Sequence, residues 1–309
     1  MKRDNADALM HQLTQQIKRD YPDWKLNNLS IAGAGIECLV CRGNTVKFGT
    51  VAIRIPWQRW LSDDNDPELD SRDILRQEAL LAAHAAKYNI PVPTPFHLHI
   101  ADDEGLDFLV SEFIPHDTEG IDEVAFGQLV KAIHQCPRPD TTLIAQGTTP
   151  LNETIAERLE RRAKILEKIE NMQLHVATVK QLDHLLSPVN GSPGSLLHMD
   201  ARPANLLAKQ GKIWAIVDWS NALLGDPAFE LARIAECDNL SMRFLEGYGQ
   251  AENAHEDFFS HLTPQVELLY RLDTAIMLAI VFLSEAPDPT LAAKQVSRVH
   301  TLDQALARA

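Results

Sequence analysis

The stretch from Ser195 to Ile234 reads SLLHMDARPANLLAKQGKIWAIVDWSNALLGDPAFELARI and decides the fold. It contains two short, mostly apolar runs, residues 205–208 and 213–217, on either side of a polar KQGK segment at 209–212. Apolar runs of that length joined by a polar turn with a glycine are typical of a β-hairpin. We therefore expect the chain to fold back on itself here.

Polar side chains stand at both ends of the predicted hairpin. His198, Asp200, Arg202 and Asn205 precede it, and Asp218 follows it. Because a hairpin returns the chain to the edge where it began, we expect Asp200, Asn205 and Asp218 to converge. Two carboxylates and an amide are hard oxygen ligands, the kind that Mg²⁺ selects. The sequence therefore predicts a magnesium site at this edge.

The motifs of this stretch resemble those of kinases. Residues 198–205, HMDARPAN, resemble the H-R-D-L-K-P-E-N catalytic loop of protein kinases, and residues 218–220, DWS, stand where D-F-G would. The pattern is closer to the aminoglycoside phosphotransferase family, itself similar to choline, homoserine and fructosamine kinases, which carries H-G-D-x-x-x-x-N, a hairpin and I-D-W. Residues 225–232, GDPAFELA, are similar to its G-D-P-x-x-D-L-A segment. The departures are Met199 for Gly, Ser220 where Glu is common, and Glu230 for Asp.

The resemblance implies a small-molecule kinase that transfers the γ-phosphoryl group of ATP to a hydroxyl group, with ATP and Mg²⁺ as cofactors. Asp200 would accept a hydrogen bond from the hydroxyl and take its proton. Asn205 and Asp218 would hold Mg²⁺ against the phosphates, and Arg202 would reach the γ-phosphate. His198 is expected to have a structural role instead.

The overall charge bears on the partners. Lys and Arg number 29 against 43 Asp and Glu, a net charge of −14. Such a surface repels nucleic acid and anionic membranes, so we expect neither as a partner. It favours a small cationic acceptor, such as an aminoglycoside or choline. The oligomeric state stays open.

The localisation that we expect is cytoplasmic. The N-terminus has no apolar run suited to a signal peptide. The longest apolar window, Thr274 to Leu283, is shorter than the roughly 20 residues of a membrane-spanning helix. Cys38 and Cys41 form a C-x-x-C without the second pair that a zinc site requires, which favours reduced thiols.

The first third of the chain predicts an antiparallel sheet that holds a nucleotide. Strands at 28–34, 36–41 and 46–55 would be joined by turns at Ala34-Gly35 and Gly43-Asn44. Gly33 and Gly35 resemble a kinase phosphate-binding loop, because glycines let backbone N–H groups approach phosphate closely. Two glycines in a turn can equally be only a turn.

A basic residue on the third strand extends this resemblance. The VAIR segment ending at Arg54 resembles the V-A-I-K of kinases, so Arg54 would hold the α- and β-phosphates. Its partner would be Glu78, on a helix predicted at 71–87. The alternative is an edge-strand arginine in solvent. The acidic segment between them, 57–70, is either a solvated loop or a lid.

The hinge of a kinase is the next feature that the chain resembles. Residues 109–115, LVSEFIP, are similar to that segment. The resemblance implies that adenine bonds the backbone carbonyl of Glu112 and the N–H of Ile114.

These features predict an α+β, two-lobed protein-kinase-like fold. Residues 1–114 would form a small antiparallel-sheet nucleotide-binding lobe, and residues 115–309 a mainly helical lobe with the catalytic loop and the acceptor pocket. Asp226 is expected to cap a helix that starts at Pro227. Helices are predicted at 7–18, 124–134, 152–186 with a break near 172–175, 230–235, 242–248, 256–285 and 289–307, and strands at 96–100 and 108–113.

Rival functions come from different classes. One is a non-catalytic, nucleotide-binding pseudokinase module, which the presence of Asp200, Asn205 and Asp218 argues against. A protein kinase proper would have the H-R-D arginine, D-F-G and A-P-E. A metal-dependent hydrolase could use the same oxygen ligands and would not need the pair of Arg54 and Glu78.

Overall fold

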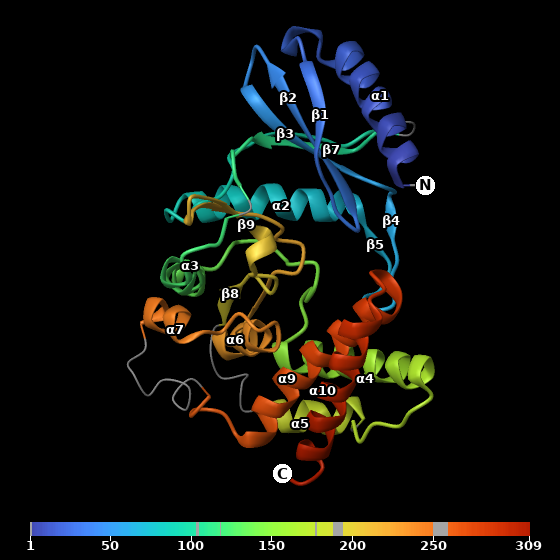
Figure 1. The fold of residues 1–309 in the computed structure, drawn as a ribbon, viewed down its shortest axis with the longest axis vertical. Coiled ribbons are helices and arrows are strands. Elements are labelled where there is room, and N and C mark those ends of the chain that lie inside the picture. The colour runs from blue at the N-terminus through green and yellow to red at the C-terminus, as the bar shows by residue number, and fades with distance from the viewer. Residues whose placement is uncertain (1, 103–104, 118, 177, 188–193, 250–258) are drawn as a thin grey trace. The chain divides into compact units, whose positions relative to one another are not determined.

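The computed structural model describes residues 2–102, 105–117, 119–176, 178–187, 194–249 and 259–309 (Figure 1). The chain forms two compact units. The first, here called the sheet unit, comprises residues 1–61, 68–120 and 206–217, and the second, the helical unit, comprises residues 62–67, 121–205 and 218–309. An antiparallel sheet in one unit and helices in the other confirm the predicted α+β class. The assignment of nucleotide binding to 1–114 and acceptor binding to 115–309 stays a prediction.

The sheet unit is built on five antiparallel strands in the order β1-β2-β3-β7-β6. Helix α1 (Lys2–Asp20) lies alongside the sheet, and its apolar face, with Leu13 and Ile17, is buried in the core. Helix α2 (Ser71–Ala86) packs against the strands at the other end of the sheet. The strands are β1 (Asn27–Ala34), β2 (Cys38–Thr45), β3 (Gly49–Pro56), β6 (Pro95–His99) and β7 (Phe108–Glu112).

The turn predicted at Gly43-Asn44 is wrong. Gly43 lies inside β2, paired with Val51, and the chain turns at residues 46–48. Gly49 closes this turn with a φ of 75°, a conformation that glycine adopts at little cost. Gly43 is small for another reason: a Cβ there would lie 2.7 Å from Cδ1 of Leu26. A glycine inside a strand marks a close approach as often as a turn.

The segment 57–70 is neither wholly solvated nor wholly part of the sheet unit. Its ends form the short strands β4 (Trp60–Leu61) and β5 (Leu69–Asp70), and Asp70 caps α2. Its middle, 62–67, belongs to the helical unit. There the backbone carbonyl of Asn65 accepts hydrogen bonds from Arg161 and Arg162 on α4, at 2.8 and 3.0 Å.

The helical unit contains long helices and a small two-stranded sheet. The strand β8 (Ser195–Leu197) pairs with β11 (Leu223–Gly225), an element too short to show in the sequence pattern. The helix predicted at 256–285 begins at Pro264, and residues 256–258 lie outside the described residues. The helices are α3 (Glu123–Gln135), α4 (Leu151–Glu170), α5 (Val179–Leu186), α6 (Pro227–Glu236), α7 (Met242–Tyr248), α9 (Pro264–Ile280) and α10 (Pro289–Leu306).

The predicted hairpin is confirmed. Strands β9 (Leu206–Lys209) and β10 (Lys212–Ile216) are joined by Gln210 and Gly211, with φ of 53° and 77°. Two consecutive positive φ values are the signature of the tight two-residue turn that suits strand twist. The hairpin packs within the sheet unit, where Asp117 accepts the N–H of Gln210 at 3.0 Å.

Within the described residues, no helix is both long enough and apolar enough to span a membrane.

The contact between α3 and α7 generates a stability prediction. A Cβ on Gly247 would lie 1.9 Å from the carbonyl oxygen of Val124, and one on Gly127 would lie 2.0 Å from that of Phe244. We expect Gly247→Ala to lower the free energy of unfolding by about 1–3 kcal/mol or more, because the helices must move apart. Urea unfolding measures this. Gly120→Ala, which meets nothing within 4 Å, is the matched control, and equal midpoints for the two variants would contradict the close packing.

Candidate active site

The segment that contains Asp200 is anchored by a buried carboxylate. Glu230 on α6, 1% exposed, accepts the backbone N–H of His198 at 2.9 Å and that of Met199 at 2.7 Å. Met199 has a φ of 61°, the left-handed region that favours glycine, and its side chain is fully buried. This conformation costs free energy for a residue with a side chain. The two bonds to a charged acceptor help to hold it.

Glu230 is ionised in this environment. Burial alone would raise the pKa of its carboxyl, but the hydrogen bond and charge of His134, the charge of His198 and the N–H of His198 together lower the pKa below its usual value. A carboxylate only accepts hydrogen bonds, so Nε2 of His134 donates to Glu230 at 2.9 Å. The hydroxyl of Tyr248 lies 2.7 Å from Nδ1 of His134. The anchor thus joins α3, α6 and α7.

His198 has the environment of a structural residue. It is fully buried, its Nδ1 accepts the N–H of Asp200 at 3.2 Å, and its ring lies 4.6 Å from that of Trp219. It therefore packs the segment before Asp200 against the residue after Asp218, which agrees with the expected structural role.

Asp200 and Asn205 are brought together as the sequence predicts. The side-chain amide of Asn205 donates to a carboxylate oxygen of Asp200 at 2.7 Å and to its backbone carbonyl at 2.9 Å. Both bonds use the amide nitrogen, so the amide oxygen of Asn205 is directed away from Asp200. An oxygen oriented in this way is suited to a hard cation.

Asp218 leaves the hairpin at the same end as Asn205. Leu206 and Ile216 are paired in the ladder, and these two polar residues lie just outside that pair. Asp218 has a φ of 73°, and its Oδ1 accepts from the hydroxyl of Ser220 at 3.2 Å. Across the described ranges, no three histidine, cysteine, aspartate or glutamate side chains are grouped as a metal site. Asp218 and Asn205 offer a carboxylate and an amide oxygen, which are the kinds of donor that Mg²⁺ prefers.

Two guanidinium groups flank Asp200. Nε of Arg202 lies 3.1 Å from one carboxylate oxygen, and the Arg202 side chain is half exposed. A nitrogen of Arg233 on α6 lies 3.7 Å from the other oxygen, and this side chain is 8% exposed. A small cavity beside Asp200 is lined by both arginines together with Cys237. Arg233 was missed by the sequence analysis, because an arginine on an amphipathic helix carries no distinctive spacing.

Arg54 and Glu78 meet inside the sheet unit. Arg54 lies on the central strand β3, and its guanidinium nitrogen is 3.9 Å from a carboxylate oxygen of Glu78 on α2. The side chains are only 14% and 10% exposed, so Arg54 is not a solvated residue of an edge strand. The planar guanidinium group of an arginine presents a rigid fork of donors that matches phosphate geometry.

The other expected nucleotide contacts lie on neighbouring strands of the sheet unit. Gly33 pairs with Val40, and the N–H of Gly35 donates to the carbonyl of Cys38 at 2.9 Å. Neither glycine needs a positive φ, and a Cβ on either would meet no close atom of the protein, so the fold itself does not require them. Their expected contact with phosphate rests on the resemblance to the kinase phosphate-binding loop.

The predicted hinge follows β7. Glu112 pairs with Val51, and its carboxylate accepts from the hydroxyl of Thr94 at 3.0 Å. Among the described residues, the N–H of Ile114 has no hydrogen-bond partner, while its carbonyl lies 3.0 Å from the ring of His116.

Asp226 and Asp273 have structural roles. Asp226 caps α6 by accepting the N–H of Ala228 at 3.0 Å, with Pro227 as the first helical residue, as predicted. Asp273 is fully buried and pairs with Arg162 at 3.1 Å. In the sequence, Glu230 is noticeable only as a departure from the family pattern. Its role as an anchor, and the role of His134, become visible only from the contacts in the folded structure.

The anchor at Glu230 generates a pH prediction. Because its pKa is lowered in the folded state, its stabilisation is present above the unfolded value of about 4.3 and is lost as the pH falls through the folded value. At pH 7, Glu230→Gln should therefore lower the free energy of unfolding by about 2–3 kcal/mol, the size of a hydrogen bond to a charged group.

Chemical unfolding across pH tests this. The difference in the free energy of unfolding between native protein and Glu230→Gln should become smaller below pH ~4, where the native carboxyl also becomes protonated. Glu246→Gln, a change at an exposed position of α7, is the control. If this difference in free energy stays constant down to acidic pH, or is absent at pH 7, then the ionised carboxylate of Glu230 does not stabilise the fold.

Comparison with known proteins agrees with this geometry. The model of the Phosphotransferase enzyme family matches residues 43–262. A candidate fructosamine-3-kinase from Haemophilus somnus 129PT is 14% identical, with a TM-score of 0.65 over 95% of this chain and 97% of that chain. A thermostable mutant of aminoglycoside phosphotransferase APH(4)-Ia, in complex with AMP-PNP and hygromycin B, is also 14% identical, with a TM-score of 0.63 over 95% and 98%. No curated protein sequence matches the chain.

The structural similarities cover nearly the whole chain and confirm the predicted protein-kinase-like fold. The family match covers residues 43–262, which include the catalytic-loop motif, the hairpin and α6. The chain belongs to the Phosphotransferase enzyme family.

Proposed function

We propose that this protein transfers the γ-phosphoryl group of ATP to a hydroxyl group of a small molecule, in the presence of Mg²⁺. Membership of a phosphotransferase family supports the reaction class. The observation that carries the proposal is the bond of 2.7 Å between Asn205 and Asp200, within a segment that Glu230 anchors. It holds the carboxylate of Asp200 next to Asn205 and leaves the amide oxygen of Asn205 for a cation.

Asp200 is the group that meets the acceptor. Its carboxylate would accept the hydrogen bond of the acceptor hydroxyl, orient the oxygen for in-line attack on the γ-phosphorus and take up the proton as the O–P bond forms. The bond between the γ-phosphorus and the oxygen that bridges it to the β-phosphate breaks at the same time, and ADP is the leaving group. Arg202, half exposed beside Asp200, has the reach to approach the transferred phosphoryl group and balance its charge.

Asn205 and Asp218 would hold Mg²⁺. When bound, the cation supplies charge neutralisation for the phosphate oxygens. Asn205 offers its amide oxygen and Asp218 a carboxylate whose backbone conformation is fixed at the end of the hairpin. The chemistry of this donor set suits Mg²⁺ better than zinc, which prefers sulfur and nitrogen.

The sheet unit would bind the nucleotide. Arg54, oriented by Glu78, would contact the α- and β-phosphates, while Gly33 and Gly35 would let backbone N–H groups approach them. Adenine would bond the carbonyl of Glu112 and the N–H of Ile114. The APH(4)-Ia mutant that resembles this chain binds AMP-PNP, an ATP analogue, which supports nucleotide use.

The alternative function is a nucleotide-binding module without catalysis. The bond between Asp200 and Asn205 argues against it, since a module that only binds nucleotide has no use for a carboxylate beside the metal ligand.

Replacement of Asp200 tests the reaction. We expect Asp200→Ala to reduce turnover on the order of 10²-fold or more, the usual size of a general-base contribution, while nucleotide binding survives. An ADP-release screen over hydroxylated metabolites and aminoglycosides first identifies an acceptor, and a nucleotide titration measures binding. Asp73→Ala, at an exposed position of α2, is the control. Near-native kcat in Asp200→Ala would refute its role as base.

Arg54 and Glu78 should act as one unit. Either alanine variant should raise the apparent KM for ATP. The free-energy loss in the double variant should be smaller than the sum of the losses in the two single variants, with a coupling of about 0.5–3 kcal/mol. Arg54→Lys should be only partly tolerated, since an ammonium group keeps the charge and loses the two-pronged geometry. Additive effects with an unchanged KM for ATP would favour the metal-dependent hydrolase.

A further inference from the structure

The surroundings of Asp200 contain an arginine that the proposed reaction does not use. The Arg233 side chain is 8% exposed and lines the small cavity beside Asp200. A guanidinium nitrogen of Arg233 lies 3.7 Å from a carboxylate oxygen of Asp200, which is beyond hydrogen-bond distance. Within the described part of the chain, it makes no hydrogen bond. A buried guanidinium group has five N–H donors, so donors directed at a cavity and left without acceptors are suited to an anion.

A second buried arginine lies on the same side of α6. The guanidinium group of Arg158 on α4 is 5.9 Å from the ring of Phe229, and Phe229 precedes Arg233 by four residues on α6. Residues four apart lie on one face of a helix, so both arginines approach the same face. Burial, opposed by the charge of Asp273, lowers the pKa of Arg158 to about 10, which leaves it charged at neutral pH.

The guanidinium group of Arg158 makes fewer and longer hydrogen bonds than that of Arg162 on the same helix. Arg162 makes bonds of 3.0 to 3.2 Å to Asn65, Asp66 and Asp273. Arg158 makes one bond of 3.4 Å to Asp273, and its buried Nε has no partner in the described chain. A buried donor without a partner is costly, so this incompletely bonded arginine is retained at the expense of stability.

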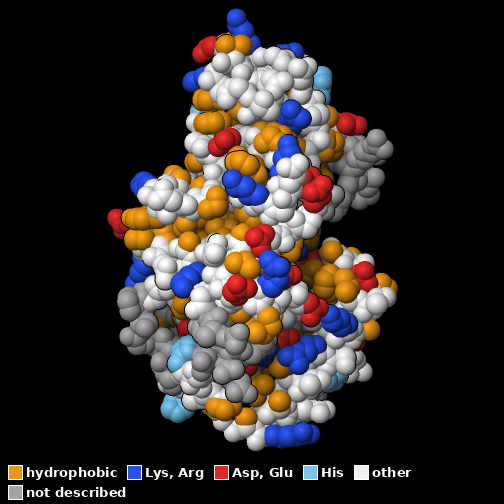
Figure 2. All heavy atoms as spheres, turned by 60° about the vertical axis from the view of Figure 1, so that its left-hand side comes forward, with side chains coloured by type: hydrophobic (Ala, Val, Ile, Leu, Met, Phe, Trp, Pro, Cys, Tyr) orange, Lys and Arg blue, Asp and Glu red, His pale blue; other side chains and the backbone are white. Residues whose placement is uncertain are grey.

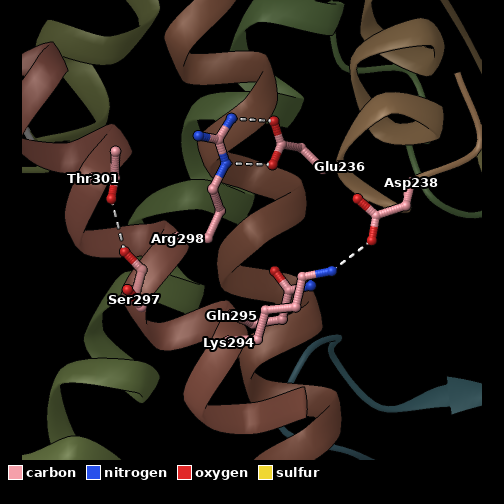
Figure 3. Close-up of a pocket in the computed structure, with 7 residues that line it drawn as sticks. All are labelled: Glu236, Asp238, Lys294, Gln295, Ser297, Arg298 and Thr301. Atoms are coloured by element: carbon pink, nitrogen blue, oxygen red, sulfur yellow. Dashed lines mark hydrogen bonds and ion pairs between the residues drawn. The ribbon is translucent and has the colours of Figure 1, made fainter. Parts of the chain in front are cut away.

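Another cavity of the helical unit shows the opposite arrangement. It has a volume of about 270 Å³, and its charged groups are paired with each other (Figure 3). Arg298 bonds both carboxylate oxygens of Glu236 at 2.7 Å, and Lys294 bonds Asp238 at 2.5 Å. Its charges are balanced within the protein. The cavity at Asp200 is lined by two arginines and by the carboxylates of Asp200 and Glu230, and Glu230 already accepts bonds from His134 and from two backbone N–H groups. Asp200 therefore remains as the carboxylate that both arginines approach.

We propose that the acceptor of this enzyme carries an anionic group, a carboxylate or a phosphate, close to its reacting hydroxyl, and that Arg233 binds it with the positive charge of Arg158 behind. This inference rests on the proposed function and names its substrate class. It reverses the expectation of a cationic acceptor drawn from the net charge of −14. Acidic and basic side chains are interspersed on the face drawn in Figure 2, so the net charge does not describe the field at one site.

The test uses four probes of one size: glycerol, glycerate, glycerol 3-phosphate and 3-amino-1,2-propanediol. They share a three-carbon skeleton and differ in charge, and the second and third separate carboxylate from phosphate. Binding to the whole protein is measured by calorimetry, and ADP release with Mg²⁺ and ATP is measured in parallel. An anionic probe should bind about 10-fold or more tightly than glycerol and the amine, the size of a hydrogen bond between charged groups.

Arg233→Gln should abolish this preference, and Arg233→Lys should keep part of it, because the charge remains. Arg298→Gln, in the other cavity, should leave it unchanged. Equal binding of the four probes, tighter binding of glycerol or the amine, or a preference that survives in Arg233→Gln would each overturn the inference. A fall in kcat that is equal for all acceptors in Arg233→Gln would assign Arg233 to positioning Asp200 and would also overturn it.

The two proposals fail differently. Preference for an anion without ADP release, when Asp200→Ala and native protein behave alike, would count against phosphoryl transfer. ADP release confined to neutral or cationic acceptors would keep the proposed function and reject the anionic acceptor.

Discussion

The carboxylate of Glu230 is the group on which the arrangement of the site depends. It accepts two backbone N–H groups from the segment before Asp200 and one from His134, in a place where water has no access. Charge-assisted bonds in a buried environment are strong and directional, and a partner lost there leaves donors unsatisfied. This fixes the left-handed conformation at Met199, which in turn sets the direction of Asp200. The loop is thus held by α6 as well as by its own hydrogen bonds.

The same helix contributes the charge next to Asp200. Glu230 and Arg233 are one turn apart on α6, so one helix supplies both the anchor of the loop and a guanidinium group facing its carboxylate. Arg202 approaches from the loop itself. Two guanidinium groups thus lie beside Asp200 in a protein of net charge −14. If Arg233 binds the acceptor as proposed, a determinant of acceptor choice lies on α6, one turn from the anchor of the loop.

Much of the fold could be predicted because its signals are local. The hairpin, the cap at Asp226 and the meeting of Asn205 with Asp200 all follow from residues near one another in the chain. The turn predicted at Gly43 is wrong because the glycine is needed there for close packing against Leu26, a residue distant in the sequence. Glu230 and its partners could not be found, since buried contacts between separate helices leave no periodic pattern.

Phosphoryl transfer itself is tested most directly by the fate of the γ-phosphoryl oxygens. ATP labelled with oxygen-18 on the γ-phosphate is incubated with the protein, Mg²⁺ and an acceptor, and the masses of the products are determined by mass spectrometry. Transfer to the acceptor hydroxyl predicts an acceptor phosphate ester that retains the labelled non-bridging oxygens, with its ester oxygen unlabelled. Labelled inorganic phosphate that has gained one oxygen from water, with the acceptor unchanged, would contradict the account and identify a hydrolase.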